Sequence, residues 1–281
     1  MTRSNPRLLT PRQLAELLEP PAAPRPLLVH VSDAAGYLEA HLPGALLVEP
    51  RELVDGGAPA PGRLPSLARL EALFARLGYS ADRHVVAYDD EGGGWAGRFL
   101  WTLDVIGHDR WSYLDGGIHA WHDEGLPLVS GAAQAPAGTT VHLEIDTGPI
   151  AELEDVLSAI GDPGQIIWDV RSGAEFLGLR SGSRRAGHVP GARHLDWLAL
   201  KDAARQQRLR EDLPALLARN GIDADKRVIT HCQSHHRSGL SYLVGRLLGM
   251  DIRAYHGSWG EWGNRDDTPV ETGGHAGEPA S

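Results

Sequence analysis

The chain of 281 residues has one cysteine, Cys232, which opens a polar run, Cys-Gln-Ser-His-His-Arg, at residues 232–237. A β-branched run at residues 228–230 precedes it and is typical of a buried parallel strand. Apolar residues then recur at helical spacing over residues 240–248, which predicts a helix. A thiol in such a strand-to-helix turn meets converging backbone N–H groups and the positive end of the helix dipole. The turn therefore favours a thiolate, and with it a nucleophile, over a thiol with a pKa of about 8.5.

The residues that follow the cysteine predict where a small anion binds. Arg237 adds positive charge beside the thiol, while His235 and His236 add donors that we expect to face solvent and to shape access for a second substrate. We predict that the substrate-binding residues are Gln233, Ser234, His235, His236, Arg237 and Ser238. A buried, inert cysteine is the alternative, but six consecutive polar or reactive residues after a buried strand argue against it.

The composition of the whole chain limits the classes of protein that it can belong to. Its 42% hydrophobic and 23% charged residues are ordinary for a globular protein, and the net charge of −10 argues against a general nucleic-acid binder. No run approaches the roughly 20 apolar residues that a membrane span needs. The N-terminus shows no apolar signal-peptide core, and a free thiol is easiest to keep in a reducing compartment. We therefore expect a cytoplasmic protein.

Alternating strand and helix patterns run through both halves of the chain. In the first half the sequence predicts helices at residues 11–18, 37–44, 64–77 and 99–106, and strands at residues 27–31, 84–88 and 111–114. In the second half it predicts a helix at residues 152–160 and a strand at residues 165–170, followed by the strand, loop and helix around Cys232. This alternation indicates an α/β fold in which helices flank parallel sheets.

The second half repeats the first. The pairs that correspond are His41 and His188, each in a His-x-Pro-Gly-Ala motif, Asp89 and Cys232, and Trp121 and Trp262, with offsets of 147, 143 and 141 residues. Offsets that drift so little indicate an internal duplication. We therefore expect an N-terminal domain at residues 1–130, a linker at residues 131–148 and a C-terminal domain at residues 149–281.

The repeat also separates structural residues from reactive ones. The His-x-Pro-Gly-Ala turn and the tryptophan occur in both halves, so we expect them to be architectural. By contrast, Asp89 replaces Cys232 in the first half, and His30 and Ser32 replace Asp169 and Arg171. The acidic residues 89–91, with the glycines that follow them, predict a surface or interdomain loop that would repel phosphate. Only the second half keeps the reactive set.

Taken together, these motifs resemble the tandem rhodaneses, sulfurtransferases with two similar domains and a cysteine in the C-terminal one. The resemblance covers roughly residues 8–270 and rests on an ordered set of motifs: Asp169-Val-Arg-Ser, Gly187-His-Val-Pro-Gly-Ala, the strand, cysteine and helix, and Gly257-Ser-Trp-Gly-Glu-Trp. It implies that the Cys232 thiolate attacks the sulfane sulfur of an anionic donor such as thiosulfate. A persulfide forms and passes its sulfur to a thiophilic acceptor, cyanide or a thiol. No metal or organic cofactor is implied, and we expect no nucleic-acid or membrane partner.

Two residues outside the loop are predicted to support it, and a third could line the pocket. We expect Asp169 and Arg171 to brace the loop through a buried hydrogen-bond network. Trp259 is expected to be a core or interdomain aromatic that could also wall the substrate pocket. Glu175 stands where the resemblance implies a substrate-binding arginine, so mercaptopyruvate would meet a like charge there, which leaves thiosulfate as the leading donor.

Three other functions remain open at this stage. A cysteine followed by an arginine also suggests a cysteine-dependent phosphatase or arsenate reductase, but those loops need five residues between the two, and this chain has four. A metal site could use His231, Cys232, His235 and His236, although adjacent ligands in a tight loop rarely converge on one ion. A persulfide carrier without turnover is the third alternative. The oligomeric state cannot be derived from the sequence.

Overall fold

The computed structural model describes residues 7–19, 25–134, 136 and 140–274. Contacts divide the chain into two compact units. The first unit contains residues 1–53, 65–146 and 202–209, and the second contains residues 54–64, 147–201 and 210–281. Each unit therefore takes in a short segment from the other half of the sequence.

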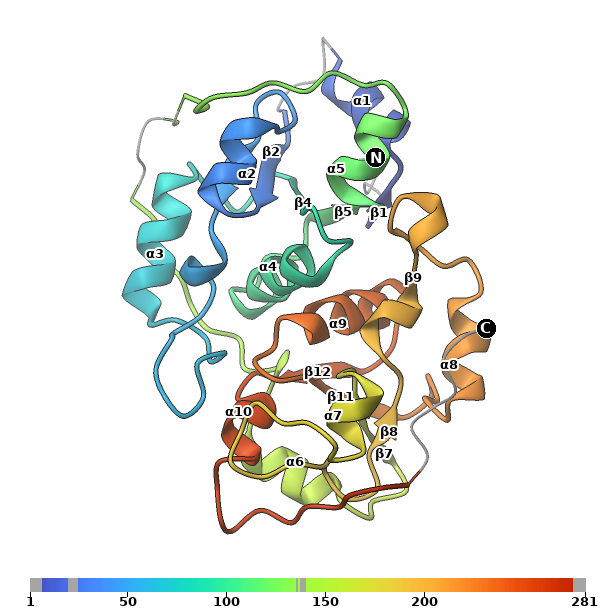
Figure 1. The fold of residues 1–281 in the computed structure, drawn as a ribbon. Helices are drawn as coiled ribbons and strands as arrows, with labels where there is room; N and C mark the ends of the chain where they lie inside the picture. The colour runs from blue at the N-terminus through green and yellow to red at the C-terminus, as the bar shows by residue number, and fades with distance from the viewer. Residues whose placement is uncertain (1–6, 20–24, 135, 137–139, 275–281) are drawn as a thin grey trace. The chain divides into compact units, whose positions relative to one another are not determined.

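The first unit is built on a five-stranded parallel sheet with the order β1-β5-β4-β2-β3 (Figure 1). Its strands are β1 (Leu8–Leu9), β2 (Leu27–Val31), β3 (Leu46–Val48), β4 (Val85–Tyr88) and β5 (Trp111–Leu114). Its helices are α1 (Pro11–Leu18), α2 (Ala34–Glu39), η1 (Pro50–Glu52), α3 (Leu67–Arg76), α4 (Gly94–Val105) and α5 (Gly117–Asp123). Helices cover both faces of this sheet, α1 and α5 on one face and α3 and α4 on the other (Figure 1).

The second unit has the same design, with a parallel sheet in the order β6-β12-β11-β7-β8. Its strands are β6 (Ile150–Ala151), β7 (Gln165–Asp169), β8 (Arg193–His194), β11 (Arg227–His231) and β12 (Ile252–Tyr255). Its helices are α6 (Leu153–Ala159), α7 (Gly173–Phe176), η2 (Trp197–Leu200), α8 (Leu213–Arg219), α9 (Arg237–Leu247) and α10 (Ser258–Trp262). Between η2 and α8 lie β9 (Lys201–Asp202), η3 (Ala203–Arg205) and β10 (Arg208–Leu209), and β9 and β10 pair as a small sheet.

The two units confirm the duplication and the α/β fold predicted from the sequence. Strand by strand, their sheets have the same order. The histidine of each His-x-Pro-Gly-Ala motif stacks on an aromatic ring, His41 on Tyr37 at 4.0 Å between ring centroids and His188 on Phe176 at 3.7 Å. Each histidine also forms a β-bridge, with Val129 and Glu271 respectively. The motif is therefore architectural in both halves, as predicted.

Three predicted helices had wrong boundaries, each because of a local turn. Helix α2 ends at Glu39, before the Pro-Gly turn, and Asp33 caps its N-terminus by accepting a hydrogen bond from the Gly36 N–H at 2.7 Å. Helix α3 begins three residues later than predicted, after Pro65. Helix α4 begins five residues earlier, because glycines at residues 92 and 93 adopt left-handed φ angles and turn the chain directly into the helix.

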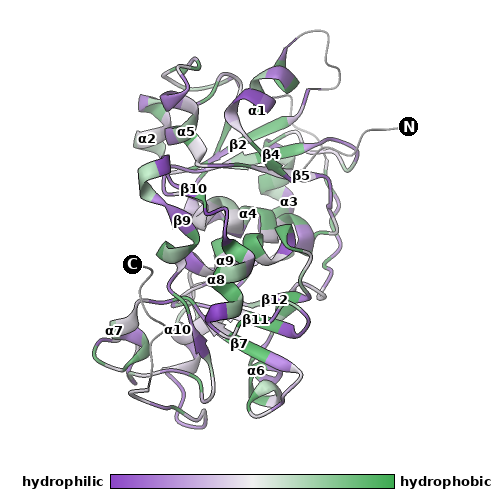
Figure 2. Cartoon of the chain, turned by 90° about the vertical axis from the view of Figure 1, so that its right-hand side faces the viewer, coloured by the Kyte–Doolittle hydropathy of each residue, from purple (hydrophilic) through white to green (hydrophobic). Residues whose placement is uncertain are grey.

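The strands lie between two covered layers, so their side chains are buried on both faces. All five residues of β2 and all four of β4 are buried, and in the second unit so are residues 228–231 of β11. Figure 2 shows this as hydrophobic colour along β4 in the first unit and along β12 and α9 in the second. Continuous apolar runs are typical of parallel strands covered on both sides. Among the described residues, no helix is both long enough and apolar enough to cross a membrane.

Candidate active site

Cys232 lies directly after β11, where the chain turns through residues 232–236 into α9. Its side chain is buried, with 1% of the residue exposed. The Thr230 and Ser241 hydroxyl oxygens lie 2.6 Å apart and tie β11 to α9, while the register of the sheet places His231 beside Asp169 of β7. The strand, loop and helix predicted from the sequence are confirmed, and they hold the thiol at the carboxyl edge of the sheet.

The surroundings of Cys232 favour its thiolate. The Ser238 hydroxyl donates a hydrogen bond to Sγ at 3.5 Å, from the first turn of α9. Burial by itself raises the pKa of Cys232, but the charge of Arg237, hydrogen bonds from the hydroxyl and backbone of Ser238, and His236 outweigh it, so the pKa is lowered. A lowered pKa gives the thiolate a larger share at neutral pH, as a nucleophile requires.

The outer side of the loop is held by the first turn of α10. The carbonyl of Cys232 accepts a hydrogen bond from the N–H of Trp259 at 2.9 Å, and the carbonyl of Gln233 accepts one from Gly260 at 2.8 Å. Ser258 binds two loop amides, because its hydroxyl oxygen accepts from the N–H of His235 at 3.1 Å and of Cys232 at 3.4 Å. These contacts fix two successive loop carbonyls towards α10.

Arg237 and Glu175 form a bidentate ion pair, with N–O distances of 2.7 and 2.9 Å. Both side chains are largely buried, Arg237 with 19% exposed and Glu175 with 7%. Burial raises the pKa of Glu175, but hydrogen bonds from Arg237 and Ser172 overcome this and lower it to about 2. The carboxylate at residue 175, which the sequence predicts to repel a carboxylate-bearing donor, is thus also the partner of the arginine beside the nucleophile.

The two loop histidines have different environments. His235 was expected to face solvent, and this is wrong: the residue is fully buried, has a left-handed φ of 53° and places Nδ1 2.8 Å from the Ser238 hydroxyl. Its ring is inside because the tight turn leads that side chain towards α9. His236 remains partly exposed, and its ring lies 5.7 Å, between centroids, from the ring of Trp197.

Asp169 and Arg171 form a buried pair behind the loop. Both side chains are fully buried, and Arg171 donates to Asp169 through Nε and Nη2 and to the Gly187 carbonyl at 2.7 Å. Burial by itself raises the pKa of Asp169. The charge of Arg171 and the hydrogen bonds that Arg171 donates together outweigh burial and hold this pKa far below its usual range. The Arg171 guanidinium lies over the ring of Trp259, 4.3 Å from its centroid. Trp259 is fully buried, so its side chain belongs to the core.

Comparison with known proteins places the chain in a family. A family model described as the rhodanese-like domain matches the chain twice, at residues 10–124 and 152–265. The chain belongs to the rhodanese family. It is 46% identical to a protein named thiosulfate sulfurtransferase in Azotobacter vinelandii, over 95% of this chain and 98% of that one. It is also 46% identical to a protein of the same name in Pseudomonas aeruginosa, over 95% and 97% of the two chains.

A solved structure gives the same result for the fold. The crystal structure titled YnjE superposes with a TM-score of 0.83, at 23% sequence identity, and the match covers 96% of this chain and 69% of that one. At this level of identity the likeness concerns the fold alone. The two rhodanese-like domains predicted from the sequence are therefore present.

The first rhodanese-like domain has a carboxylate where the second has its thiol. Asp89 follows β4 and is fully buried, so of the two predicted positions, surface or interdomain, the surface one is wrong for this residue. Its Oδ1 accepts hydrogen bonds from the N–H groups of Gly92 and Gly93 at 3.0 and 2.8 Å, and its Oδ2 accepts from Ala96 at 2.9 Å. The pKa of Asp89 is raised to about 6, mainly by burial and also by the charge of Glu91, while the hydrogen bonds from these N–H groups reduce the rise. The loop therefore encloses an anion that belongs to the chain itself.

Some residues of the site could not be identified from the sequence. Ser258 belongs to the Gly-Ser-Trp motif that was given an architectural role, although the glycine at the matching residue 117 was a usable signal. Trp197 lies in no recognised motif, yet its ring contacts that of His236, and the Lys201 amine lies 4.0 Å from the centroid of the Trp197 ring. Ser183 lies 3.1 Å from the Gln233 amide nitrogen, which donates to it. These contacts join segments that are far apart in the chain.

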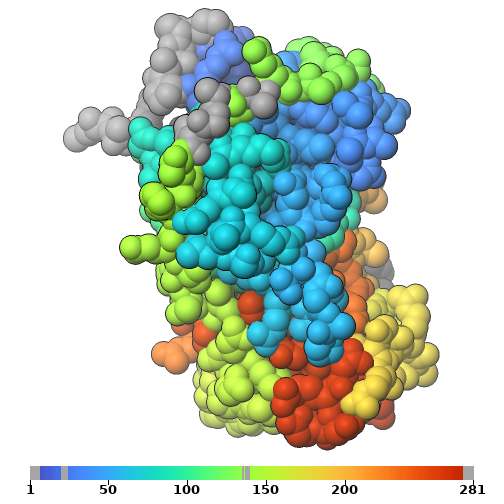
Figure 3. Space-filling model, turned by 90° about the vertical axis from the view of Figure 1, so that its left-hand side faces the viewer, coloured from blue at the N-terminus to red at the C-terminus, as the bar shows by residue number. Residues whose placement is uncertain are grey.

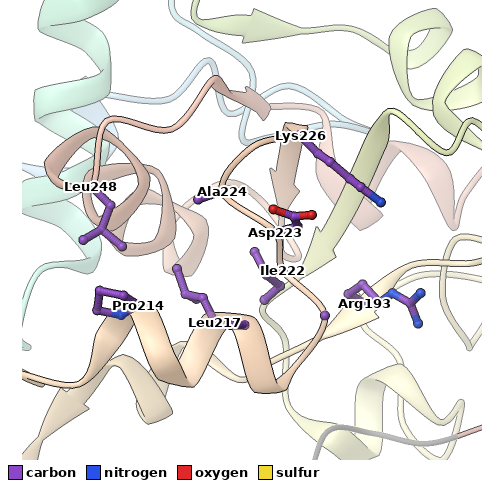
Figure 4. A pocket seen from close by; sticks show the side chains of 10 residues that line it. Arg193, Pro214, Leu217, Ile222, Asp223, Ala224, Lys226 and Leu248 are labelled. Carbon is purple, nitrogen blue, oxygen red and sulfur yellow. The ribbon is translucent and has the colours of Figure 1, made fainter.

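The cavity shown in Figure 4 is separate from the cysteine. It has a volume of about 640 Å³ and lies between α8 and the end of α9, with Leu217, Ile222 and Leu248 among its lining residues. Arg193 and Lys226 belong to the amino ends of β8 and β11, whereas Cys232 follows the carboxyl end of β11. The cavity is thus at the opposite edge of the sheet from the thiol. Within the described residues, no three His, Cys, Asp or Glu side chains are grouped to hold a metal ion.

Proposed function

We propose that this protein is a thiosulfate sulfurtransferase that works through a persulfide on Cys232. The observation that carries the proposal is a single buried thiol with a lowered pKa in a loop built to face an anion. Membership of the rhodanese family and the names of the two relatives that are 46% identical support it.

The reaction consists of two displacements at sulfur. The Cys232 thiolate attacks the outer sulfur of thiosulfate, a new S–S bond forms, and the original S–S bond breaks as sulfite leaves with its electron pair. Cyanide or a thiolate then attacks the terminal sulfur of the persulfide, and the Cys232 thiolate is released unchanged. No electron is gained or lost overall, and no cofactor is needed for either step.

We assign the loop residues to the binding of the donor. Backbone N–H groups of Gln233, Ser234, His236 and Ser238 supply positive dipoles, whereas the N–H of His235 donates to Ser258. Arg237 supplies a charge beside these groups. Such preorganised donors stabilise both the bound dianion and the departing sulfite. Asp169 and Arg171 act from behind by fixing the start of the loop, and the buried Trp259 supports Arg171.

Intact-protein mass spectrometry tests the persulfide. Wild-type protein incubated with thiosulfate should gain the mass of one sulfur atom and lose it when cyanide is added, whereas Cys232→Ser should gain nothing. Repeated turnover in a thiosulfate and cyanide assay separates the enzyme from a carrier that is loaded only once. A wild-type protein that never gains sulfur would refute the proposal.

Two further assignments follow the same reasoning. A thiol that must stay free between turnovers is best kept in a reducing compartment, so we propose a cytoplasmic location. We also propose that residues 131–148 connect the two rhodanese-like domains, between the matches at residues 10–124 and 152–265.

A further inference from the structure

A short segment from the N-terminal half of the sequence lies against the catalytic loop. Residues 54–64, which we name the strap, belong by their contacts to the second unit. In Figure 3 the light-blue spheres of this part of the chain meet the red spheres of the C-terminal residues. Gly260 at the start of α10 is the meeting point, because a Cβ built there would lie 3.0 Å from the Gln233 carbonyl oxygen and 3.4 Å from that of Pro59.

The strap is anchored firmly to the second unit. Arg63 donates to Glu261 of α10 at 2.6 Å, and the N–H of Leu64 donates to Nδ1 of His256 at 3.0 Å. Within the strap, the N–H of Asp55 donates to the Arg63 carbonyl at 2.8 Å, and the N–H of Gly56 donates to the Pro61 carbonyl at 3.0 Å. The strap is therefore a closed turn that is fixed at its base.

Next to this base, at Gly62, the strap touches the backbone of the loop. A Cβ built on Gly62 would lie 2.1 Å from the Ser234 carbonyl oxygen and 2.8 Å from the Ser234 Cα. On the other side of the same peptide group, the N–H of His235 donates to the Ser258 hydroxyl oxygen at 3.1 Å. The peptide group that joins Ser234 to His235 is thus held from both sides.

The strap completes a pattern over three successive residues. The carbonyls of Cys232 and Gln233 are held outward by amides of α10, and the third carbonyl, of Ser234, faces Gly62. When carbonyls are fixed outward, the N–H groups of a tight loop turn inward and make an anion-binding concavity. We propose that the strap acts in sulfur transfer through Gly62, which is a positioning residue: by contact with the Ser234 carbonyl it fixes the Ser234 peptide group, and with it the path of the loop around the Cys232 sulfur and the donor.

The inference rests on the proposed function, and one pair of variants tests it. Neither Gly62 nor Gly57 has a left-handed φ angle, so alanine suits the backbone at both. At Gly57 a Cβ would meet only the side-chain carboxylate of exposed Asp55, whereas at Gly62 it would meet loop backbone. Because a displacement of about 1 Å in a catalytic group can cost about 10²-fold, we expect Gly62→Ala to lower kcat/KM for thiosulfate at least about tenfold, and Gly57→Ala to leave it unchanged.

A second measurement separates positioning from general damage. The rate of Cys232 alkylation by iodoacetamide against pH gives the thiol pKa without any sulfur donor, and we expect Gly62→Ala to raise that pKa. Equal kinetics and equal alkylation profiles in Gly62→Ala and Gly57→Ala would overturn the inference. If Gly62→Ala does not fold, the same alkylation measurement is made on Arg63→Ala, which releases the strap from Glu261 without a clash. A raised thiol pKa in that variant supports the inference, and an unchanged pKa overturns it. A wild-type protein that takes up no sulfur from thiosulfate would instead refute the proposed function.

Discussion

The ion pair between Arg237 and Glu175 leads to a prediction about the pKa of Cys232, because its two partners shift this pKa in opposite directions. Arg237 is the charge that most lowers the pKa of Cys232, and the Glu175 carboxylate compensates part of that charge at 2.7 Å. The change Glu175→Gln keeps the shape of the side chain and removes its negative charge. It should therefore lower the pKa of Cys232 further, whereas Arg237→Gln should raise it and leave a buried carboxylate behind.

The expected shift can be estimated from the burial of the pair. With 19% and 7% of the side chains exposed, an effective dielectric constant of about 20 is appropriate. For a separation set at roughly 8 Å, a unit charge then changes the free energy of ionising a thiol by about 2 kcal/mol. This corresponds to about 1.5 pKa units, and solvent around Arg237 reduces it to roughly one. From lowest to highest pKa, we expect the order Glu175→Gln, wild type, the double variant, Arg237→Gln.

The assay is the alkylation rate of Cys232 by iodoacetamide as a function of pH. Since this is the only cysteine in the chain, the measured rate belongs to one group. Arg180→Gln is the matched control, because Arg180 is also near Glu175, at 3.5 Å, but its side chain is 70% exposed. A raised pKa in Glu175→Gln, or a double variant that equals Arg237→Gln, would refute the reasoning.

Three further predictions concern donor binding and stability. Arg237→Ala should raise the KM for thiosulfate more than it lowers kcat; steady-state kinetics with both parameters unchanged would remove Arg237 from the donor site. Asp169→Ala should destabilise the protein by about 3–5 kcal/mol in urea unfolding, because Arg171 would remain buried without its counterion, and a loss below about 1 kcal/mol would contradict this account. The pKa of Glu175 is depressed to about 2 from 4.5, so its stabilising contribution is present above pH 4.5 and is lost as the pH falls towards 2. Glu175→Gln should accordingly show a weaker fall in Tm over that interval than wild type, and parallel curves would argue against it.

Local patterns made the central part of the site predictable. The β-branched residues before Cys232 and the apolar spacing after it predicted the strand and helix, since both signals come from side chains near in sequence. The duplication then predicted which residues are architectural, and His41 and His188 are so in the structure. Parallel sheets followed from the alternation of elements.

Contacts between distant residues were beyond such patterns. Glu175 and Arg237 are 62 positions apart, and no periodicity indicates that they pair. The burial of His235 depends on a left-handed turn at a residue type that only sometimes adopts one. Asp89 was placed in a surface or interdomain loop because three successive acidic residues are usually solvated, whereas the residue is buried and backbone N–H groups of its own loop bind the carboxylate.

The strap has a counterpart that bears on how the two halves depend on each other. Residues 202–209, from the C-terminal half, belong by contacts to the first unit, where the N–H of Leu209 donates to the Asp115 carboxylate at 2.8 Å. Each half thus lends one segment to the other, and a gene cut between residues 131 and 148 would yield a C-terminal fragment that keeps its nucleophile and lacks residues 54–64. The half without a cysteine thus supplies the active copy with a segment that lies against its catalytic loop and that the second half of the sequence does not contain.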